Sequence, residues 1–321
     1  MISVSVVICC YNSSKTISKT LEYLLNQVVD FDWEIVLVNN NSTDNTLDII
    51  NGYISRNKIK ITIVNEIKSG KSYALLKGVI SAQGKYIIIC DDDNLLKNNY
   101  ISLAYSILEN NPEIGILGGR GEIYTENKNS IPFWFTSFQN DYAIGVQNIY
   151  SGDISARGYL WGAGSAFNRT IFLDFINEGI NFKLTCRNGD ELTSGGDTEY
   201  CCWFLLAGYK LWYDEDLVYY HYITDDRLTK EYLTKLIEGT SSFNTIIATY
   251  HQLLQDFNLE NTAFKRLKSI IKSSLLLLIS TIKWKDFRFT IQRLYPLNRH
   301  LVVDSVYHDL YKIFYRLRAK K

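Results

Sequence analysis

Three consecutive acidic residues, Asp91, Asp92 and Asp93, are the clearest candidates for chemistry in this sequence. They come directly after Tyr86–Cys90, an apolar run with the composition of a buried strand. Alternate residues of an extended segment point to the same side, so Asp91 and Asp93 can converge while Asp92 faces away. Adjacent carboxylates repel one another unless a cation is present, and hard oxygen ligands suit Mg²⁺ or Mn²⁺ that also takes phosphate oxygens. The alternative is an acidic turn that caps a helix.

A separate acidic residue, Asp197, follows Gly195-Gly196 and opens a helical pattern that runs to Gly208. A carboxylate at a helix start interacts favourably with the helix dipole, so a plain N-cap is one interpretation of Asp197. The other is a general base that takes the proton from an attacking hydroxyl. A hydroxyl is far less acidic than Asp, whose usual pKa is about 3.9, so this transfer must accompany attack on an electrophile with a stabilised leaving group. A diphosphate bound to a metal ion is such a leaving group.

Three weaker signals lie at other predicted strand and helix ends. His221 stands near the end of the strand-like run Leu217–Tyr222, where it is either a core residue or a further metal ligand. Asparagines gather at Asn12 and at Asn39–Asn41, and their amides can either contact a base or ribose or form turns. Gly70-Lys71 could bring backbone amides and a cation close to a phosphate.

The elements that must position these residues alternate along the first 120 residues. The β-rich runs are Val4–Cys10, Trp33–Val38, Ile59–Val64 and Tyr86–Cys90, and the helical patterns are Ser14–Gln27, Thr43–Ser55, Ser72–Ser81 and Asn98–Asn110, with Ser14 and Ser42 as the expected N-caps. Such apolar runs predict parallel strands buried on both faces. The alternation predicts right-handed crossovers in an open, doubly wound sheet, and ligands of such sheets bind at the carboxyl ends of the strands.

The charge of the chain is unevenly distributed, although 34 Lys+Arg balance 34 Asp+Glu. The net charge is −9 over residues 1–227 and +9 over residues 228–321. Residues 115–187 are aromatic and rich in glycine, and we expect residues 121–227 to build the acceptor side of a cleft. We therefore predict a catalytic domain over 1–227, with a nucleotide-binding half over about 1–120, and a basic helical C-terminal region over 228–321.

The sequence also bears on the location of the protein. None of the six cysteines forms a CxxC pair, which fits reduced, mostly buried thiols better than disulfides or a zinc site. The N-terminus lacks the basic start and apolar run of a secretory signal, and no apolar stretch approaches the roughly 20 residues of a spanning helix. We expect a cytoplasmic protein with no nucleic-acid partner.

The basic tail has two interpretations. Basic residues in 264–268 and 283–285 bracket its most apolar helical pattern, as expected of a segment that lies peripherally on an anionic membrane surface, here the inner face of the cytoplasmic membrane. The alternative is a helical subdomain that packs on the body of the protein or on a second subunit of a homodimer. The sequence leaves both interpretations open.

Taken together, these motifs resemble the family 2 glycosyltransferases, which have the GT-A fold, a Rossmann-like α/β fold with a mainly parallel sheet and flanking helices. The resemblance is carried by 6–12, 34–46, 84–94, 161–164, 195–199, 207–213 and His221, and it spans about two thirds of the chain. It implies an inverting transfer of one hexosyl or N-acetylhexosaminyl group from a nucleotide-diphosphosugar, with UDP expected, to a hydroxyl acceptor. The expected acceptor is a glycan or a lipid-linked precursor in surface polysaccharide synthesis.

The resemblance also implies a role for each candidate residue. Asp197 matches the catalytic base, and Asp93, Asp91 and His221 match the residues that hold Mn²⁺ or Mg²⁺. The matching nucleotide-binding positions are Cys10, Tyr11, Asn12, Asn39, Gly70, Lys71, Asp91 and Asp92, and the acceptor or sugar positions are Trp161, Gly162, Ala163, Gly196 and Glu199.

Some positions depart from the family pattern, and two other functions stay open. Cys9-Cys10 replace a common Pro-Thr, Asn39 stands where an Asp often reads the base, and Gly196 replaces a frequent Glu. No QxxRW segment follows, which argues against a processive polymer synthase. The alternatives are a sugar-1-phosphate nucleotidyltransferase, although the Gly-rich, Arg-containing loop of that class is missing after the first strand, and a non-catalytic nucleotide-sugar-binding protein.

Overall fold

The computed structural model describes residues 2–55, 59–187, 193–241, 244–259 and 305–321. It divides into two compact units, Met1–Ile247 and Ala248–Lys321. The predicted boundary at residue 227 therefore falls within the first unit, which also holds the next helix, α8 (Lys230–Ser241).

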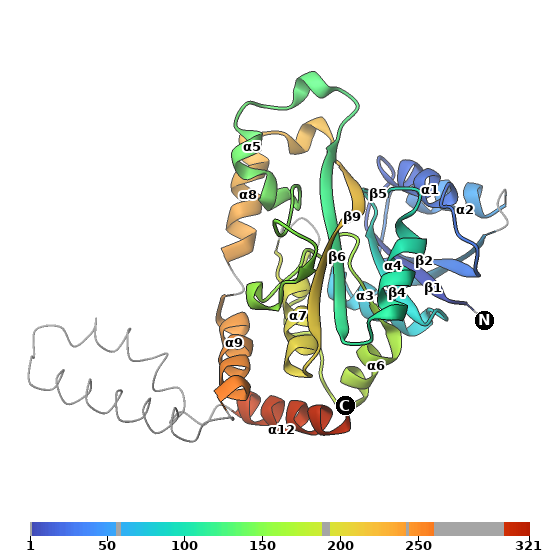
Figure 1. The fold of residues 1–321 in the computed structure, drawn as a ribbon. Coiled ribbons are helices and arrows are strands. Elements are labelled where there is room, and N and C mark those ends of the chain that lie inside the picture. Colours follow the sequence, from blue (N-terminus) through green and yellow to red (C-terminus); the bar gives the residue numbers. More distant parts are fainter. Residues whose placement is uncertain (1, 56–58, 188–192, 242–243, 260–304) are drawn as a thin grey trace, which may run out of the picture. The chain divides into compact units, whose positions relative to one another are not determined.

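The first unit is built on one mixed sheet (Figure 1). Its strands are β1 (Val4–Cys10), β2 (Trp33–Asn39), β3 (Lys60–Asn65), β4 (Tyr86–Asp91), β5 (Asn94–Leu96), β6 (Ile114–Tyr124), β7 (Gly152–Asp153), β8 (Ala166–Asn168) and β9 (Lys210–Tyr222). The order along the sheet is β3-β2-β1-β4-β8-β6-β9-β5, and β7 pairs with β9. The first four strands are parallel, whereas β8 and β5 run antiparallel to their neighbours, so the sheet has the predicted mainly parallel N-terminal half.

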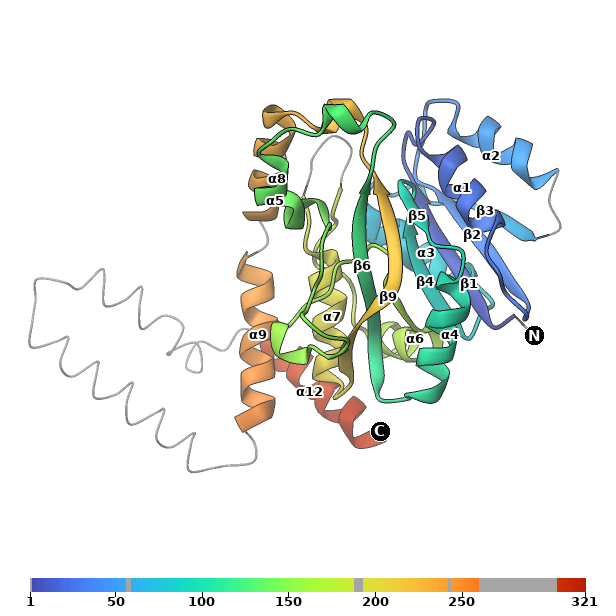
Figure 2. The ribbon, with the colours of Figure 1, turned by 45° about the horizontal axis from the view of Figure 1, so that its top comes forward.

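Helices cover both faces of this sheet (Figure 2). They are α1 (Ile17–Leu25), α2 (Thr46–Ile54), α3 (Lys71–Ser81), α4 (Tyr100–Asn110), α5 (Phe135–Phe138), α6 (Arg169–Asn177) and α7 (Gly196–Leu206). Apolar residues of α1, α2 and α4 pack with alternate residues of β1 and β2 in one core. On the opposite face α3 packs so closely on β1 that a Cβ at Gly78 would meet Val7. The apolar periodicity of the sequence thus predicted these layers.

Two local expectations were wrong. The strand β3 lies at the edge of the sheet and is only half-buried, because none of the described strands covers its outer side. The helices α1 and α2 begin later than predicted, after Thr16 and Asn45, and neither residue caps its helix with its side chain. The backbone amide of Ser14 instead donates to Asp44 Oδ2 at 3.0 Å, so Ser14 links the two loops.

The strands β6 and β9 are paired along most of their length, and glycine makes part of this pairing sterically feasible. A Cβ at Gly119 would stand 1.9 Å from the carbonyl oxygen of Leu217 in β9. This close approach fixes the second half of the sheet, and β9 carries His221 towards the end of β4.

A small apolar cluster lies beyond the end of β9. We call it the anchor cluster, and its buried members are Phe135, Tyr142, Ile144, Ile223, Leu228, Leu233 and Leu236. It joins the segment around α5 to the chain that leaves β9 and enters α8. A domain boundary at residue 227 would divide this cluster.

The second unit contains most of α9 (Asn244–Leu259) and the whole of α12 (Ser305–Lys320). Phe257 stacks on Tyr311 with ring centroids 4.8 Å apart, and Arg318 lies 4.6 Å from the Phe257 ring. The two basic stretches on which the membrane hypothesis rests, 264–268 and 283–285, lie outside the described residues. In the described part of the chain, no helix is both long enough and apolar enough to span a membrane.

Candidate active site

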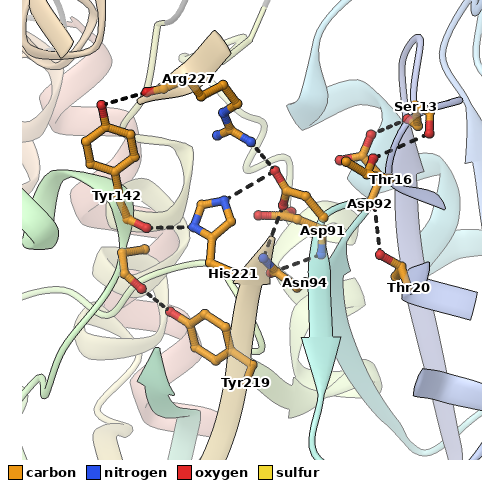
Figure 3. Close-up of polar contacts among 12 residues, drawn as sticks. Ser13, Thr16, Thr20, Asp91, Asp92, Asn94, Tyr142, Tyr219, His221 and Arg227 are labelled. Carbon is orange, nitrogen blue, oxygen red and sulfur yellow. Dashed lines mark hydrogen bonds and ion pairs between the residues drawn. The ribbon is translucent and has the colours of Figure 1, made fainter. Parts of the chain in front are cut away.

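The acidic residues lie in a tight turn at the carboxyl end of β4 (Figure 3). The strand ends at Asp91, and the chain turns through Asp92 and Asp93 before β5 begins at Asn94. The Asn94 side chain accepts from the Asp91 amide at 3.2 Å and donates to Asp93 Oδ1 at 3.1 Å. Because β5 pairs antiparallel with β9, Asn94 stands opposite His221. Strand pairing therefore brings the acidic turn and the histidine together.

Asp93 is the most strongly paired carboxylate of the turn. Its Oδ2 lies 3.2 Å from His221 Nε2 and 2.5 Å from Arg227 Nη1, and the residue is only 8% exposed. Burial by itself raises the pKa of Asp93, but the charges and hydrogen bonds of His221 and Arg227 hold it well below its usual range. Asp93 is therefore ionised at neutral pH.

The hydrogen bonds of His221 fix the proton on its ring. Nδ1 lies 2.6 Å from the carbonyl oxygen of Tyr142, and a carbonyl only accepts, so we assign the proton to Nδ1. Nε2 faces Asp93 Oδ2, where it donates a hydrogen bond when it carries a proton and can bind a metal ion when it does not. A backbone carbonyl behind Nδ1 is the usual support of a histidine that ligates a metal through Nε2.

Asp93 and His221 are suitable ligands for a divalent cation. The distance of 3.2 Å between Asp93 Oδ2 and His221 Nε2 is close to the about 3 Å that separates neighbouring ligands of an octahedral ion with bonds of about 2.1 Å. Within the described residues, no group of three or more His, Cys, Asp and Glu side chains converges as a metal site. Asp93 and His221 would therefore hold the ion together with oxygens of a substrate, as Mg²⁺ commonly requires. The predicted triad with Asp91 is not formed.

The other two carboxylates have different partners. Asp91 forms an ion pair with Lys71, whose Nζ lies 2.5 Å from Asp91 Oδ1. Asp92 points away from the other two aspartates, as predicted, and accepts a hydrogen bond from the Ser13 hydroxyl. Burial and the neighbouring charge of Asp93 raise the pKa of Asp92 to about 7, although the Ser13 hydroxyl opposes this shift. Lys71 and Arg227 thus supply the cations that three adjacent acids require.

Asp197 lies in the first turn of α7 and is half-buried. Its Oδ2 accepts from the Gly162 amide at 3.2 Å, and its Oδ1 accepts from the Thr198 amide at 2.8 Å. Burial raises the pKa of the Tyr219 hydroxyl well above its ordinary value, and the charges of Asp91, Asp93 and Asp197 add to this effect. The charges of the acidic turn and of Asp197 thus act on the same buried tyrosine of β9.

Comparison with known proteins now identifies the family. A family model described as glycosyl transferase family 2 matches residues 5–172, which is more than half of the chain. The chain belongs to glycosyl transferase family 2. The match begins in β1 and ends in α6, so it includes the acidic turn and Gly162.

Several relatives resemble this family 2 chain. "Glycosyltransferase GlyG" of Streptococcus pneumoniae is 29% identical over 44% of this chain and 46% of its own length. The poly-beta-1,6-N-acetyl-D-glucosamine synthase of Staphylococcus epidermidis is 30% identical over 40% of this chain and 30% of its own. The chain thus matches less than half the length of these relatives. A longer match, 26% identical over 75% of this chain and 71% of the relative, is to a dolichyl N-acetyl-alpha-D-glucosaminyl phosphate 3-beta-D-2,3-diacetamido-2,3-dideoxy-beta-D-glucuronosyltransferase of Methanococcus voltae.

A solved structure supports the fold. Residues 1–349 of S. aureus TarS in complex with UDP-GlcNAc superpose with a TM-score of 0.53 at 17% identity. The superposition covers 82% of this chain and 73% of that one. The GT-A fold expected from the sequence is confirmed.

The helix start at Gly70-Lys71 differs from the expected phosphate site of this family 2 chain. The amides of Lys71 and Ser72, which would face a phosphate, donate to the carbonyl oxygens of Cys186 and Thr185 at 2.8 and 3.2 Å. The helix start is therefore closed by the segment 183–187, and only the Lys71 ammonium faces the acidic turn. The sequence could not show this, because the covering segment comes from more than a hundred residues further along the chain.

The asparagines hold the loops at the strand ends. Asn12 has φ 51°, and its side chain accepts from the Thr43 amide at 2.8 Å. Asn39 accepts from the Ser42 amide at 3.1 Å and donates to Asn65 at 3.1 Å, and Asn39 itself is half-buried. The turn-forming alternative thus accounts for much of this asparagine pattern. Of the other two predicted nucleotide-binding residues in these loops, Cys10 is buried and Tyr11 is 44% exposed.

Most of the predicted acceptor residues are buried or bonded to other groups of the protein. Trp161, Ala163 and Gly196 are buried, and Gly162 is engaged through its amide by Asp197. Glu199 is completely buried and accepts from the backbone amides of Lys183 and Leu184 at 2.9 and 3.0 Å. It therefore does not face an acceptor as expected, but holds the segment 183–187 against α7.

The sequence analysis missed two residues of the site. In the sequence Arg227 marks the point where the charge changes sign, and Tyr142 belongs to no motif. The positions of Arg227 and Tyr142 depend on the anchor cluster, which brings these two residues together although they are 85 positions apart in the chain. An arginine six positions after a predicted metal-binding histidine was the one available signal.

Proposed function

We propose that this protein is an inverting, metal-dependent glycosyltransferase that moves one sugar from a UDP-sugar to a hydroxyl acceptor. The observation that carries the proposal is the contact of an ionised Asp93 with His221, together with the position of Cys186, whose carbonyl oxygen accepts from the amide of Lys71, the partner of Asp91, and whose Sγ accepts from the amide of Gly196, the neighbour of Asp197. Such a site combines a place for a cation with a separate carboxylate that can accept a proton.

Each residue has a distinct part in the proposed reaction. Asp93 and His221 hold Mn²⁺ or Mg²⁺, which when bound supplies positive charge to the leaving diphosphate. Asp197 takes the proton of the acceptor hydroxyl as its oxygen attacks the anomeric carbon, and the bond to the diphosphate breaks on the opposite side. The Gly162 and Thr198 amides hold the Asp197 carboxylate in place during this step. A single displacement of this kind inverts the anomeric configuration.

The comparisons support the substrate classes. The TarS neighbour is described as a complex with UDP-GlcNAc, which supports a UDP-sugar donor. Relatives include the poly-beta-1,6-N-acetyl-D-glucosamine synthase and a poly(ribitol-phosphate) beta-glucosyltransferase of Bacillus spizizenii, which support an acceptor in surface polymer synthesis.

The test compares the wild-type protein with Asp197→Asn. A panel of UDP-sugars with Mn²⁺ is screened by thermal shift, and the best donor is assayed for release of UDP with glycan acceptors. We expect Asp197→Asn to bind the donor as the wild type does and to lose about 100-fold or more in transfer, which is the scale of general-base catalysis. Asp174→Asn, which changes an exposed carboxylate of α6, is the matched control and should keep full activity.

Three results would contradict the proposal. Wild-type turnover by Asp197→Asn would remove the base assignment. Release of pyrophosphate from a nucleoside triphosphate and a sugar phosphate would favour a nucleotidyltransferase. Donor binding without transfer to any acceptor would favour a binding protein.

A further inference from the structure

Arg227 occupies the same carboxylate oxygen that the proposed cation would use. Its Nη1 lies 2.5 Å from Asp93 Oδ2, and His221 Nε2 lies 3.2 Å from that oxygen. Two cations on one carboxylate oxygen would repel each other strongly in a partly buried site. A divalent cation on Asp93 therefore requires Arg227 to move away.

The backbone of Arg227 is firmly held. The residue ends a short turn, Asp225–Arg227, and its carbonyl oxygen accepts from the Tyr142 hydroxyl at 3.0 Å. The next residue, Leu228, is buried in the anchor cluster. Tyr142 also supplies the carbonyl oxygen that binds His221, so one residue positions both groups that face Asp93. Movement of Arg227 would be confined to its side chain.

The guanidinium of Arg227 has free donors. Its Nε donates to the Tyr232 hydroxyl at 2.9 Å and its Nη1 donates to Asp93, which uses two of its five N–H groups. The remaining N–H groups have no hydrogen-bond partner in the described part of the chain, and the side chain is 21% exposed. A partly exposed guanidinium with free N–H groups is well suited to bind phosphate oxygens.

We propose that Arg227 is an internal counter-ion, which pairs with Asp93 in the free protein and transfers to the diphosphate of the donor when a divalent cation takes its place on Asp93. This inference rests on the proposed function. In the free protein the arginine offsets the charge of a buried carboxylate. When the donor binds, its diphosphate provides the negative charge that receives the arginine.

The exchange couples metal binding to donor binding. A metal ion that binds alone must displace Arg227 and leave the guanidinium without an anionic partner. A metal ion that binds with the nucleotide meets no such cost, because the diphosphate pairs with Arg227. By linkage, the nucleotide must raise the affinity for the metal by the same factor as the metal raises the affinity for the nucleotide.

Mn²⁺ binding to the full chain tests this exchange by electron paramagnetic resonance or calorimetry, with and without UDP. We expect Arg227→Gln to bind Mn²⁺ alone at least about tenfold more tightly than the wild type, and to bind UDP with Mn²⁺ at least about tenfold more weakly. Arg227→Met keeps the apolar part of the side chain beside Tyr232 and should behave in the same way if Arg227→Gln folds poorly. Lys85→Gln removes an equal charge at the opposite end of β4, where Lys85 pairs with Glu109, and should leave both affinities unchanged.

The outcomes separate this inference from the proposed function. If the wild type binds Mn²⁺ in the presence of UDP but both Arg227 variants bind Mn²⁺ alone no more tightly, the counter-ion role is overturned and the metal site stands. If the wild type binds no Mn²⁺ even with UDP, the metal site and the counter-ion role both fall.

Discussion

Asp92 gives the site a pH dependence that can be measured without a substrate. In the folded protein its pKa is raised to about 7 from an ordinary value of 3.8, first by burial and then by the charge of Asp93. The folded state therefore holds this proton more tightly than the unfolded state does. Protonation stabilises the fold, and this stabilisation is lost as the pH rises through about 7.

The magnitude follows from linkage between the two pKa values. For a carboxyl that titrates at 3.8 when unfolded and at about 7 when folded, the free energy of unfolding falls by about 3 kcal/mol between about pH 5 and pH 8. Asp92→Asn has no proton to lose, so it escapes this loss. Relative to the wild type, the variant should gain up to about 3 kcal/mol in stability over this interval.

Urea unfolding of both proteins at the two pH values, with a chelator present, measures this difference. Tryptophan fluorescence suits the measurement, because five of the six tryptophans lie within the first unit. Asp44→Asn is the control. Although burial raises the pKa of Asp44, hydrogen bonds from Ser14 and Thr46 lower it to about 2, so the effect of this substitution should be constant over the interval. A change of less than about 0.5 kcal/mol for Asp92→Asn would refute the reasoning.

Three other substitutions test separate parts of the structure. Glu199→Gln should lower the free energy of unfolding by about 1–3 kcal/mol, because one buried backbone amide loses its acceptor, and unchanged urea unfolding would contradict this bond network. His221→Asn should weaken Mn²⁺ binding in the presence of UDP by about tenfold or more, as measured by calorimetry, and an unchanged affinity would remove His221 from the metal site. Gly119→Ala should destabilise the fold by at least about 2 kcal/mol, because its Cβ would stand 1.9 Å from the Leu217 carbonyl oxygen, and a melting temperature equal to that of the wild type would contradict the close approach of β6 and β9.

Much of the N-terminal half was predictable because local pattern and burial agree there. The strand β1 has the predicted bounds, and β4 ends at Asp91, one residue beyond the prediction. Continuous apolar runs identify strands that helices cover on both faces. The edge strand β3 carries a similar apolar composition, so its position at the edge could not be inferred from its residues alone.

The candidate site was predictable only in part. The position of three acidic residues after a predicted strand indicated the acidic turn. The order of the motifs along the chain indicated Asp197 and His221. The partners of these residues depend on contacts between distant parts of the chain. Arg227 reaches Asp93 across 134 positions, and Glu199 turns inward because a segment of backbone amides lies beside it. Such contacts cannot be inferred from residue types and their spacing alone.

The segment 183–187 has a consequence for how the site opens. It donates two amides to Glu199 of α7 and provides three carbonyl oxygens to Lys71 and Ser72 at the start of α3, so it is bonded to both helices. Amides that share one such network exchange with deuterated solvent as a single cooperative unit. The lysine that pairs with Asp91 and the carboxylate of Asp197 are consequently carried by one rigid block. If an acceptor enters beside Asp197 as proposed, the motion that admits it has to arise elsewhere around the site, and the distance between these two charges stays fixed.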